Sequence, residues 1–279
     1  MAAVYTPTLR GRVLALELRR IRERTGLSQA EAARRMSWDK NKMSRIEQPS
    51  TQPTDDDVRA LLQMYGLDAN RLEALLHLNQ DAWQRGWWTA YGDAFCGQFI
   101  MLEDQAPEIF GFENALVPGL FQTADYARAI IAGLLNVTGS DLDRRVAARL
   151  ARQAVLERSS PPRIHYLIDE AVLDRDIGDP DIMRKQVHAL REAADRSTVT
   201  LQIVPLSARV HAGFEGPFTI FGFPQDRGLD VGHSEGILGE WYAESADQLA
   251  KLRLAFSNVS GAAMTPDETL EFLAARAPA

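Results

Sequence analysis

The sequence predicts an α+β chain of two domains: an all-α, five-helix domain over residues 1–80 and a mixed helical and small-sheet domain over residues 81–279. Hydrophobic residues make up 46% of the 279 positions, enough for two separate cores. The apolar period is helical at first and shortens to that of strands after about Pro161. Residues 10–47 hold 11 Lys and Arg against 5 Asp and Glu, a net charge of +6. Since the whole chain carries −7, the rest carries −13. A basic first part and an acidic second part indicate different roles.

The stretch SQAEAARRMSWDKNKMSRIE, residues 28–47, predicts two short helices joined by a tight turn. Ser28 and Asp39 are the expected N-caps of the two helices. Met43 and Ile46, three positions apart, face inward on the second helix and leave its polar residues outside. The spacing is typical of a helix-turn-helix that binds DNA. Two amphipathic helices with an ordinary solvated face are the alternative.

The outer face of this motif carries side chains suited to DNA. The predicted DNA-binding residues are Gln29, Lys40, Asn41, Lys42, Ser44 and Arg45. Lys and Arg pair with guanine or phosphate and Asn pairs with adenine, whereas Gln29, at a helix N-terminus, is expected to contact phosphate. Because one recognition helix makes few base contacts, we expect a homodimer on an inverted-repeat operator in double-stranded DNA.

The remaining elements follow from periodicity. Further helices are expected over residues 8–24, 55–65 and 70–83 in the first domain, and the second domain should be helical up to residue 160. Expected strands are RIHYLI, TVTLQIVP and GPFTIFGF, with LDVGH and GILGEW as weaker candidates. A helix over residues 179–195 lies between the first two strands and predicts that they are parallel. Two helices, residues 246–259 and 266–275, close the chain.

A ligand or partner site in the second domain is the least determined feature. The candidate residues are Trp87, Trp88, Tyr91, Gln122 and Tyr126. These aromatic residues could line an apolar pocket under Trp87 and Trp88 or form an exposed patch for a protein. Aromatic residues at helical spacing also commonly belong to a core.

The sequence predicts no enzyme, metal site or cofactor. The histidines, among them His165 and His233, show no metal-ligand spacing, and no His-Glu-x-x-His or Gly-rich phosphate loop is present. Lys185 and Lys251 are the only lysines of the second domain, which disfavours a self-cleaving Ser-Lys repressor. The single cysteine, Cys96, excludes an intramolecular disulfide. No signal peptide or long apolar run opens the chain, so we expect a cytoplasmic protein without membrane contact.

The runs GLSQAEAA and WDKNKMSRIE resemble the lambda-repressor-like, xenobiotic-response-element type of helix-turn-helix regulator. Ala32 stands where that family usually has Leu, and Ser37 stands where it usually has Gly. The first departure implies a thinner local core, and the second implies a cost of about 1 kcal/mol if the turn is left-handed. The resemblance also implies a structural ion pair between Arg22 and Glu47.

Motifs along most of the chain resemble one actinobacterial group of antitoxin-like regulators. They are WW, LE, VPGLFQT, DYARAI, RQ-x-VL, DEAVL, and QIVP before GPFTI. Members of that group are often paired with a small partner protein. The resemblance therefore implies a transcriptional regulator that senses a small ligand or binds a small protein, or alternatively an antitoxin-like protein that neutralises its partner and autoregulates its own operon.

Overall fold

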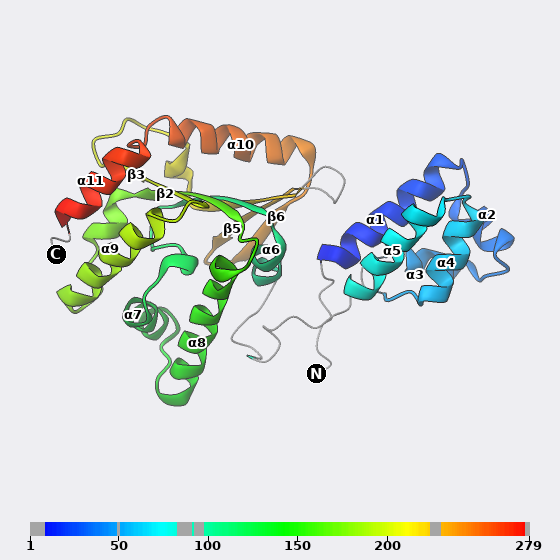
Figure 1. Cartoon of the computed structure of the whole chain (residues 1–279), viewed down its shortest axis with the longest axis horizontal. Coiled ribbons are helices and arrows are strands. Elements are labelled where there is room, and N and C mark those ends of the chain that lie inside the picture. The colour runs from blue at the N-terminus through cyan, green and yellow to red at the C-terminus, as the bar shows by residue number, and fades with distance from the viewer. Residues whose placement is uncertain (1–8, 49–50, 83–90, 92–97, 224–229, 277–279) are drawn as a thin grey trace. The chain divides into compact units, whose positions relative to one another are not determined.

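The computed structural model describes residues 9–48, 51–82, 91, 98–223 and 230–276. Trp87 and Trp88 lie outside the described residues. The chain divides into two compact units (Figure 1). The first comprises Met1–Ala90 with Cys96–Met101, and the second comprises Tyr91–Phe95 with Leu102–Ala279.

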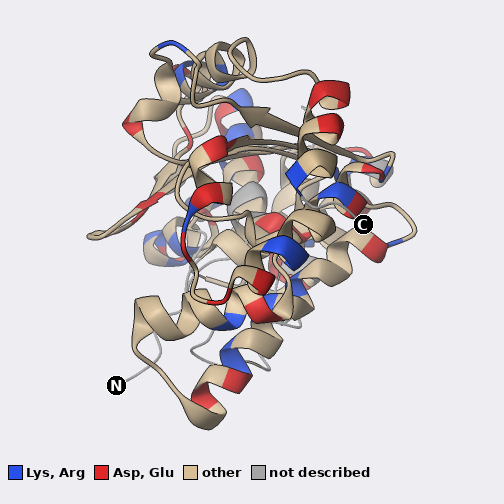
Figure 2. Ribbon diagram, turned by 90° about the vertical axis from the view of Figure 1, so that its left-hand side faces the viewer, with Lys and Arg blue, Asp and Glu red and all other residues tan. Residues whose placement is uncertain are grey.

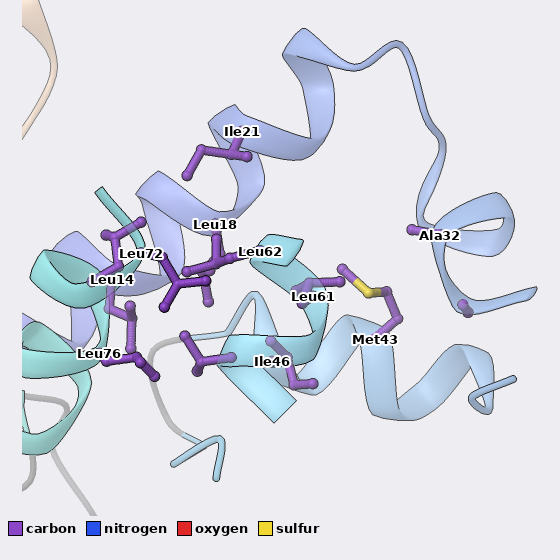
Figure 3. Close-up of a cluster of buried hydrophobic side chains, with 13 residues drawn as sticks. Leu14, Leu18, Ile21, Ala32, Met43, Ile46, Leu61, Leu62, Leu72 and Leu76 are labelled. Carbon is purple, nitrogen blue, oxygen red and sulfur yellow. The ribbon is translucent and has the colours of Figure 1, made fainter. Parts of the chain in front are cut away.

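Five helices lie in the described residues between 9 and 82. They are α1 (Leu9–Arg24), α2 (Gln29–Arg35), α3 (Lys40–Ile46), α4 (Asp55–Met64) and α5 (Ala69–Ala82). Their apolar faces meet in one core, drawn in Figure 3, in which Leu18, Met43 and Leu61 are fully buried. The partly buried Trp38 packs against this core. The helical period of the sequence thus identifies the residues that form the core.

Local capping sets the ends of α2 and α3. The Ser28 hydroxyl accepts a hydrogen bond from the Glu31 backbone N–H at 3.2 Å, and Asp39 Oδ1 accepts one from the Asn41 N–H at 3.0 Å. Ser37, in the turn between the helices, has a left-handed φ of 54°. Because a Cβ is unfavourable in that region, the turn carries backbone strain at Ser37.

The second unit contains a six-stranded sheet in the order β3-β2-β1-β4-β5-β6. The strands are β1 (Glu108–Glu113), β2 (Arg163–Asp169), β3 (Val199–Val204), β4 (Phe218–Gly222), β5 (Val231–Gly236) and β6 (Gly239–Ala243). Strands β1, β2 and β3 are parallel, while β4, β5 and β6 pair antiparallel. The prediction that β2 and β3 are parallel is confirmed.

Strand β1 was not predicted, and it lies within the range expected to be helical. It is nevertheless central, since it pairs with both β2 and β4. Gly111 interrupts its apolar pattern because the Tyr166 ring lies over this position, where an added Cβ would come within 2.0 Å of a ring carbon. The sheet is therefore larger than the sequence indicates.

Helices cover both faces of the sheet. They are α6 (Phe99–Gln105), α7 (Ala124–Leu135), α8 (Gly139–Ala151), α9 (Pro180–Ala194), α10 (Ala246–Ser260) and α11 (Pro266–Arg276). The 3-10 turns are η2 (Gly119–Phe121), η3 (Arg152–Glu157), η4 (Glu170–Asp174) and η5 (Ala212–Glu215). Helix α10 runs along one face, and α7, α8 and α9 lie on the other side (Figure 1).

The edge strand β3 is covered by the segment that leads into α11. Met264 donates its N–H to the Ile203 carbonyl at 2.8 Å, and the Thr269 hydroxyl accepts from the Ile203 N–H at 3.1 Å. These bonds satisfy edge groups that would otherwise face solvent. Basic and acidic side chains are interspersed along the helices of this unit (Figure 2), as where Asp141 pairs with Arg144 at 2.6 Å and Arg145 at 3.0 Å. In the described part of the chain, no helix combines the length and apolar character needed to span a bilayer.

Candidate DNA-binding surface

The helix α3 presents three exposed polar side chains. Lys40, Asn41 and Arg45 are exposed, and Ser44 is partly buried between them and the core. Lys40 and Asn41 occupy the first turn, which is the part of a recognition helix that enters a major groove most deeply. A guanidinium, an ammonium and an amide on one short helix supply hydrogen-bond groups for both guanine and adenine.

Lys42 differs from the other predicted contacts because its ammonium group already has a partner. Its Nζ lies 2.6 Å from Asp57 Oδ1 on α4 and 4.3 Å from the centre of the Trp38 ring. The ion pair and the cation–π contact both hold the side chain against the protein. Neither Asp57 nor Trp38 was a predicted site residue. In this arrangement Lys42 orients α3 relative to α4.

Three side chains join at the far end of α3. Arg22 Nε donates to Glu47 Oε1 at 2.6 Å, and its Nη2 donates to Glu47 Oε2 at 3.0 Å. The same guanidinium donates to the Leu27 carbonyl at 2.7 Å. Only 7% of Arg22 and 9% of Glu47 are exposed. The hydrogen bonds from Arg22 to Glu47 raise the pKa of the guanidinium even though burial opposes them.

Gln29 is the third member of this network. Its Nε2 donates to Glu47 Oε2 at 2.8 Å, and its side chain is partly buried at the first turn of α2. Glu47 therefore receives hydrogen bonds from α1 and α2 at the point where α3 ends. A bidentate, charge-assisted contact of this kind requires a narrow range of geometries. It therefore fixes the orientation of α3 relative to α1 and α2.

The predicted ligand residues of the second unit do not form one site. Tyr126 is fully buried, and its hydroxyl oxygen accepts a hydrogen bond from the Val117 N–H at 3.1 Å, which makes it part of the core. Tyr91 is partly buried, and its carbonyl accepts from Arg144 at 3.0 Å. Gln122 is buried, and its Oε1 accepts from Arg149 at 3.1 Å. Tyr91 and Gln122 each accept a hydrogen bond from an arginine of α8, but the two arginines differ.

The histidine nearest to the predicted strands lies in an apolar setting. His165 packs between Phe110 and Phe256 and bonds through Nε2 to Gln202 Oε1 at 2.6 Å. Burial lowers the pKa of His165, although its hydrogen bond to Gln202 Oε1 opposes this shift. Within the described ranges, no group of three or more His, Cys, Asp or Glu side chains could hold a metal ion.

Comparison with protein families gives two matches along the chain. Residues 13–75 match a helix-turn-helix domain, and residues 96–275 match a domain of unknown function, DUF5753. The second match covers more than half of the chain, so the chain belongs to the DUF5753 family. Comparisons with curated proteins and with solved structures gave no match. The helix-turn-helix match indicates a DNA-binding regulator, whereas the larger domain brings no known activity with it.

Proposed function

We propose that this protein is a sequence-specific, DNA-binding transcriptional regulator of the lambda-repressor-like, xenobiotic-response-element type. The observation that carries the proposal is the exposure of Lys40, Asn41 and Arg45 on a helix whose end is held by Arg22 and Glu47. A rigid helix with free base-reading side chains is what major-groove recognition requires. The positive charge of residues 10–47 supports the same function, since phosphate attraction supplies most of the non-specific affinity.

The proposal includes a homodimer on an inverted repeat and a binding role, not an enzymatic one, for the C-terminal domain. It implies action on chromosomal DNA and hence a cytoplasmic protein. In one form of the proposal, the C-terminal domain binds a small ligand, and this binding changes the affinity of the protein for DNA. The motif order shared with actinobacterial antitoxin-like regulators supports a second version, in which the domain binds a small protein encoded next to it. Co-purification with the product of an adjacent small reading frame would support this version.

The test of DNA reading uses the full chain and an operator selected from a pool of random DNA. Asn41→Ala and Arg45→Ala should each lose about 1 to 3 kcal/mol, or about 5- to 160-fold in affinity, on this operator. Binding to unselected DNA should change little. Arg71→Ala is the matched control, because Arg71 is exposed on α5 and pairs with Glu17 at 2.7 Å. Equal losses on both DNAs would make Asn41 and Arg45 phosphate contacts, and failure to select any sequence would refute specific binding.

A further inference from the structure

Strand β6 is one edge of the six-stranded sheet. Within the described ranges, no strand pairs with the side of β6 that faces away from β5. The other edge, β3, is covered by hydrogen bonds to Met264 and Thr269. Proteins usually protect an open edge with lysine or proline, and the β6 sequence GEWYA has neither. The sheet is therefore covered at β3 and can be extended at β6.

The pairing of β5 with β6 determines which backbone groups of β6 point outward. Gly236 pairs with Gly239, so the loop between the strands has two residues. A loop of this length is closed by a hydrogen-bonded pair, and bonded and non-bonded pairs then alternate along the two strands. The backbone groups of Trp241 therefore point toward β5, whereas those of Glu240 and Tyr242 point away from it. A further antiparallel strand would bond to Glu240 and Tyr242 and not to Trp241.

The same hairpin exposes large apolar side chains next to acidic ones. Trp241 is 52% exposed, and Ile237 and Leu238 in the loop are fully exposed. Glu235 and Glu240 face each other across the two strands. Two carboxylates repel the phosphates of DNA and the surface of an anionic membrane. Apolar groups beside them therefore favour another protein chain as the partner.

Charge restricts the register in which a second β6 strand can pair with the first. Residues directly opposite share a face of the sheet, so a two-fold antiparallel pair has one residue on the axis, opposite itself. With Glu240 on the axis, two carboxylates would meet beside Glu235. With Tyr242 on the axis, Glu240 would face Glu244. With Trp241 on the axis, Glu240 faces Tyr242, whose hydroxyl is a donor and bonds to Glu240 Oε2 within one copy at 2.7 Å. Because like charges directly opposite are destabilising, the register centred on Trp241 is favoured.

We propose that two copies of this protein pair through β6, antiparallel and with Trp241 on the two-fold axis. The two sheets then join into one, and Glu240 of each copy exchanges backbone hydrogen bonds with Tyr242 of the other. The two Trp241 rings meet at a non-bonded position, where opposite side chains come closest. This inference rests on the homodimer proposed above and names its interface. Because β3 is covered, a third copy has no equivalent edge to join, and assembly stops at two.

The size of the interface determines the conditions of the test. Stable interfaces bury roughly 1,200 to 2,000 Å² of surface, and one pair of five-residue strands lies at or below the low end of that range. The free chains should therefore form a weak dimer. An inverted-repeat operator holds two copies side by side and raises their effective concentration. Pairing through β6 should be more complete on the operator than in the free protein.

Disulfide cross-linking of the full chain tests the register, in a Cys96→Ser background that removes the single native cysteine. Opposite residues at a non-bonded position have Cα atoms about 4.5 Å apart, a distance that a disulfide spans. Trp241→Cys should therefore cross-link to its own counterpart under mild oxidation, both in the free protein and on the selected operator. Leu238→Cys is the matched control. It is fully exposed on the same hairpin, but its counterpart lies about 20 Å away along the strand in this register, so it should not cross-link.

A charge exchange at the same position tests the pairing without a covalent bond. Trp241→Lys and Trp241→Glu each place two like charges on the axis. Sedimentation of the full chain should show that each change weakens the dimer by about tenfold or more. An equal mixture of the two variants should associate again, because lysine then faces glutamate across the axis.

The outcomes distinguish this interface from the proposed function. A dimer that neither cross-links at Trp241→Cys nor responds to the charge exchange would overturn pairing through β6 and leave the homodimer in place. A chain that stays monomeric on its selected operator would overturn both the interface and the homodimer. Cross-linking at Trp241→Cys in a protein that selects no operator would support the interface and refute specific DNA binding.

Discussion

Arg22 and Glu47 connect the last turn of α1 to the end of α3 through hydrogen bonds of 2.6 and 3.0 Å, and both side chains are buried. Neither residue is exposed to solvent as Lys40 and Arg45 are. The pair instead sets the angle of α3, while Gln29 adds the start of α2 to the same carboxylate. The position of the exposed side chains of α3 thus depends on a buried contact at the end of that helix.

Loss of one partner of this pair should be costly. Arg22→Met and Glu47→Gln each leave a buried charge or a buried polar group unpaired, so each should destabilise the N-terminal unit by about 3 kcal/mol. The double variant should recover part of this loss, because the two residues interact directly. Calorimetric melting of the full chain measures all three variants. Strictly additive effects, or two single variants with wild-type melting, would show that the pair contributes nothing.

Gln29→Ala should weaken binding to all DNA sequences alike. The amide lies at the first turn of α2, where helix N-termini approach phosphates, and it also holds Glu47 at 2.8 Å. Both effects act on the position of the motif and not on base choice. Binding to the selected operator and to operators with single-base changes would be compared for the variant and the wild type. A changed order of preference among these DNAs would make Gln29 a base-reading residue.

Ser37→Gly should stabilise the N-terminal unit by up to about 1 kcal/mol. Its φ of 54° is unfavourable for a residue with a Cβ, and glycine removes that strain at an exposed position. Gly26→Ala is the reverse control: its φ is 73° and an added Cβ would contact nothing, so only backbone strain opposes the change. The melting temperature should rise in the first variant and fall in the second. A shift of the same sign in both would contradict this account.

Local patterns account for the part of the fold that the sequence predicted. Ser28 and Asp39 cap helices through bonds that span two or three residues, and such bonds depend on the adjacent sequence alone. Strand β1 was missed because Gly111 interrupts its apolar pattern and because it is stabilised by pairing with strands far along the chain. A strand of this kind has no adequate local signal.

The site residues divide in the same way. The outer positions of α3 follow from helical spacing, so Lys40 and Arg45 could be chosen from the sequence. The contact of Lys42 with Asp57 joins two helices, and the ion pair of Arg152 with Glu103 joins η3 to α6. Neither contact can be predicted from the spacing of apolar residues, because the packing of separate elements decides which charged side chains meet.

The protein should bind its operator as a dimer. Helix α3 has seven residues, and Lys40, Asn41 and Arg45 are its proposed base contacts, too few for strong discrimination by one copy. Sedimentation of the full chain with its selected operator should give two copies per DNA, and the selected sequence should be an inverted repeat with half-sites about one helical turn apart. A specific complex with one copy on an asymmetric site would contradict this prediction.

The final prediction concerns His233, which makes the fold sensitive to mild acid. This residue is 5% exposed and its ring lies 5.0 Å from that of Tyr242, measured between centroids. Burial lowers its pKa from the usual 6.5 to about 4 in the folded protein. Between these values the unfolded chain binds the proton and the folded chain does not, so stability falls as the pH is lowered from 6.5 towards 4. The loss attributable to this group should be on the order of 1 to 3 kcal/mol.

His233→Gln should remove that contribution, because glutamine does not titrate. Glu113 acts in the opposite direction: its folded pKa of about 8 lies above the usual 4.5, so its contribution is present at low pH and is lost as the pH rises through 8. The difference in unfolding free energy between His233→Gln and the wild type cancels this second effect. Denaturant melts of both proteins from pH 4 to pH 7 should show that difference shifting in favour of the variant as the pH falls. A difference that is constant over this range would mean that His233 has the same pKa in the folded and unfolded chains.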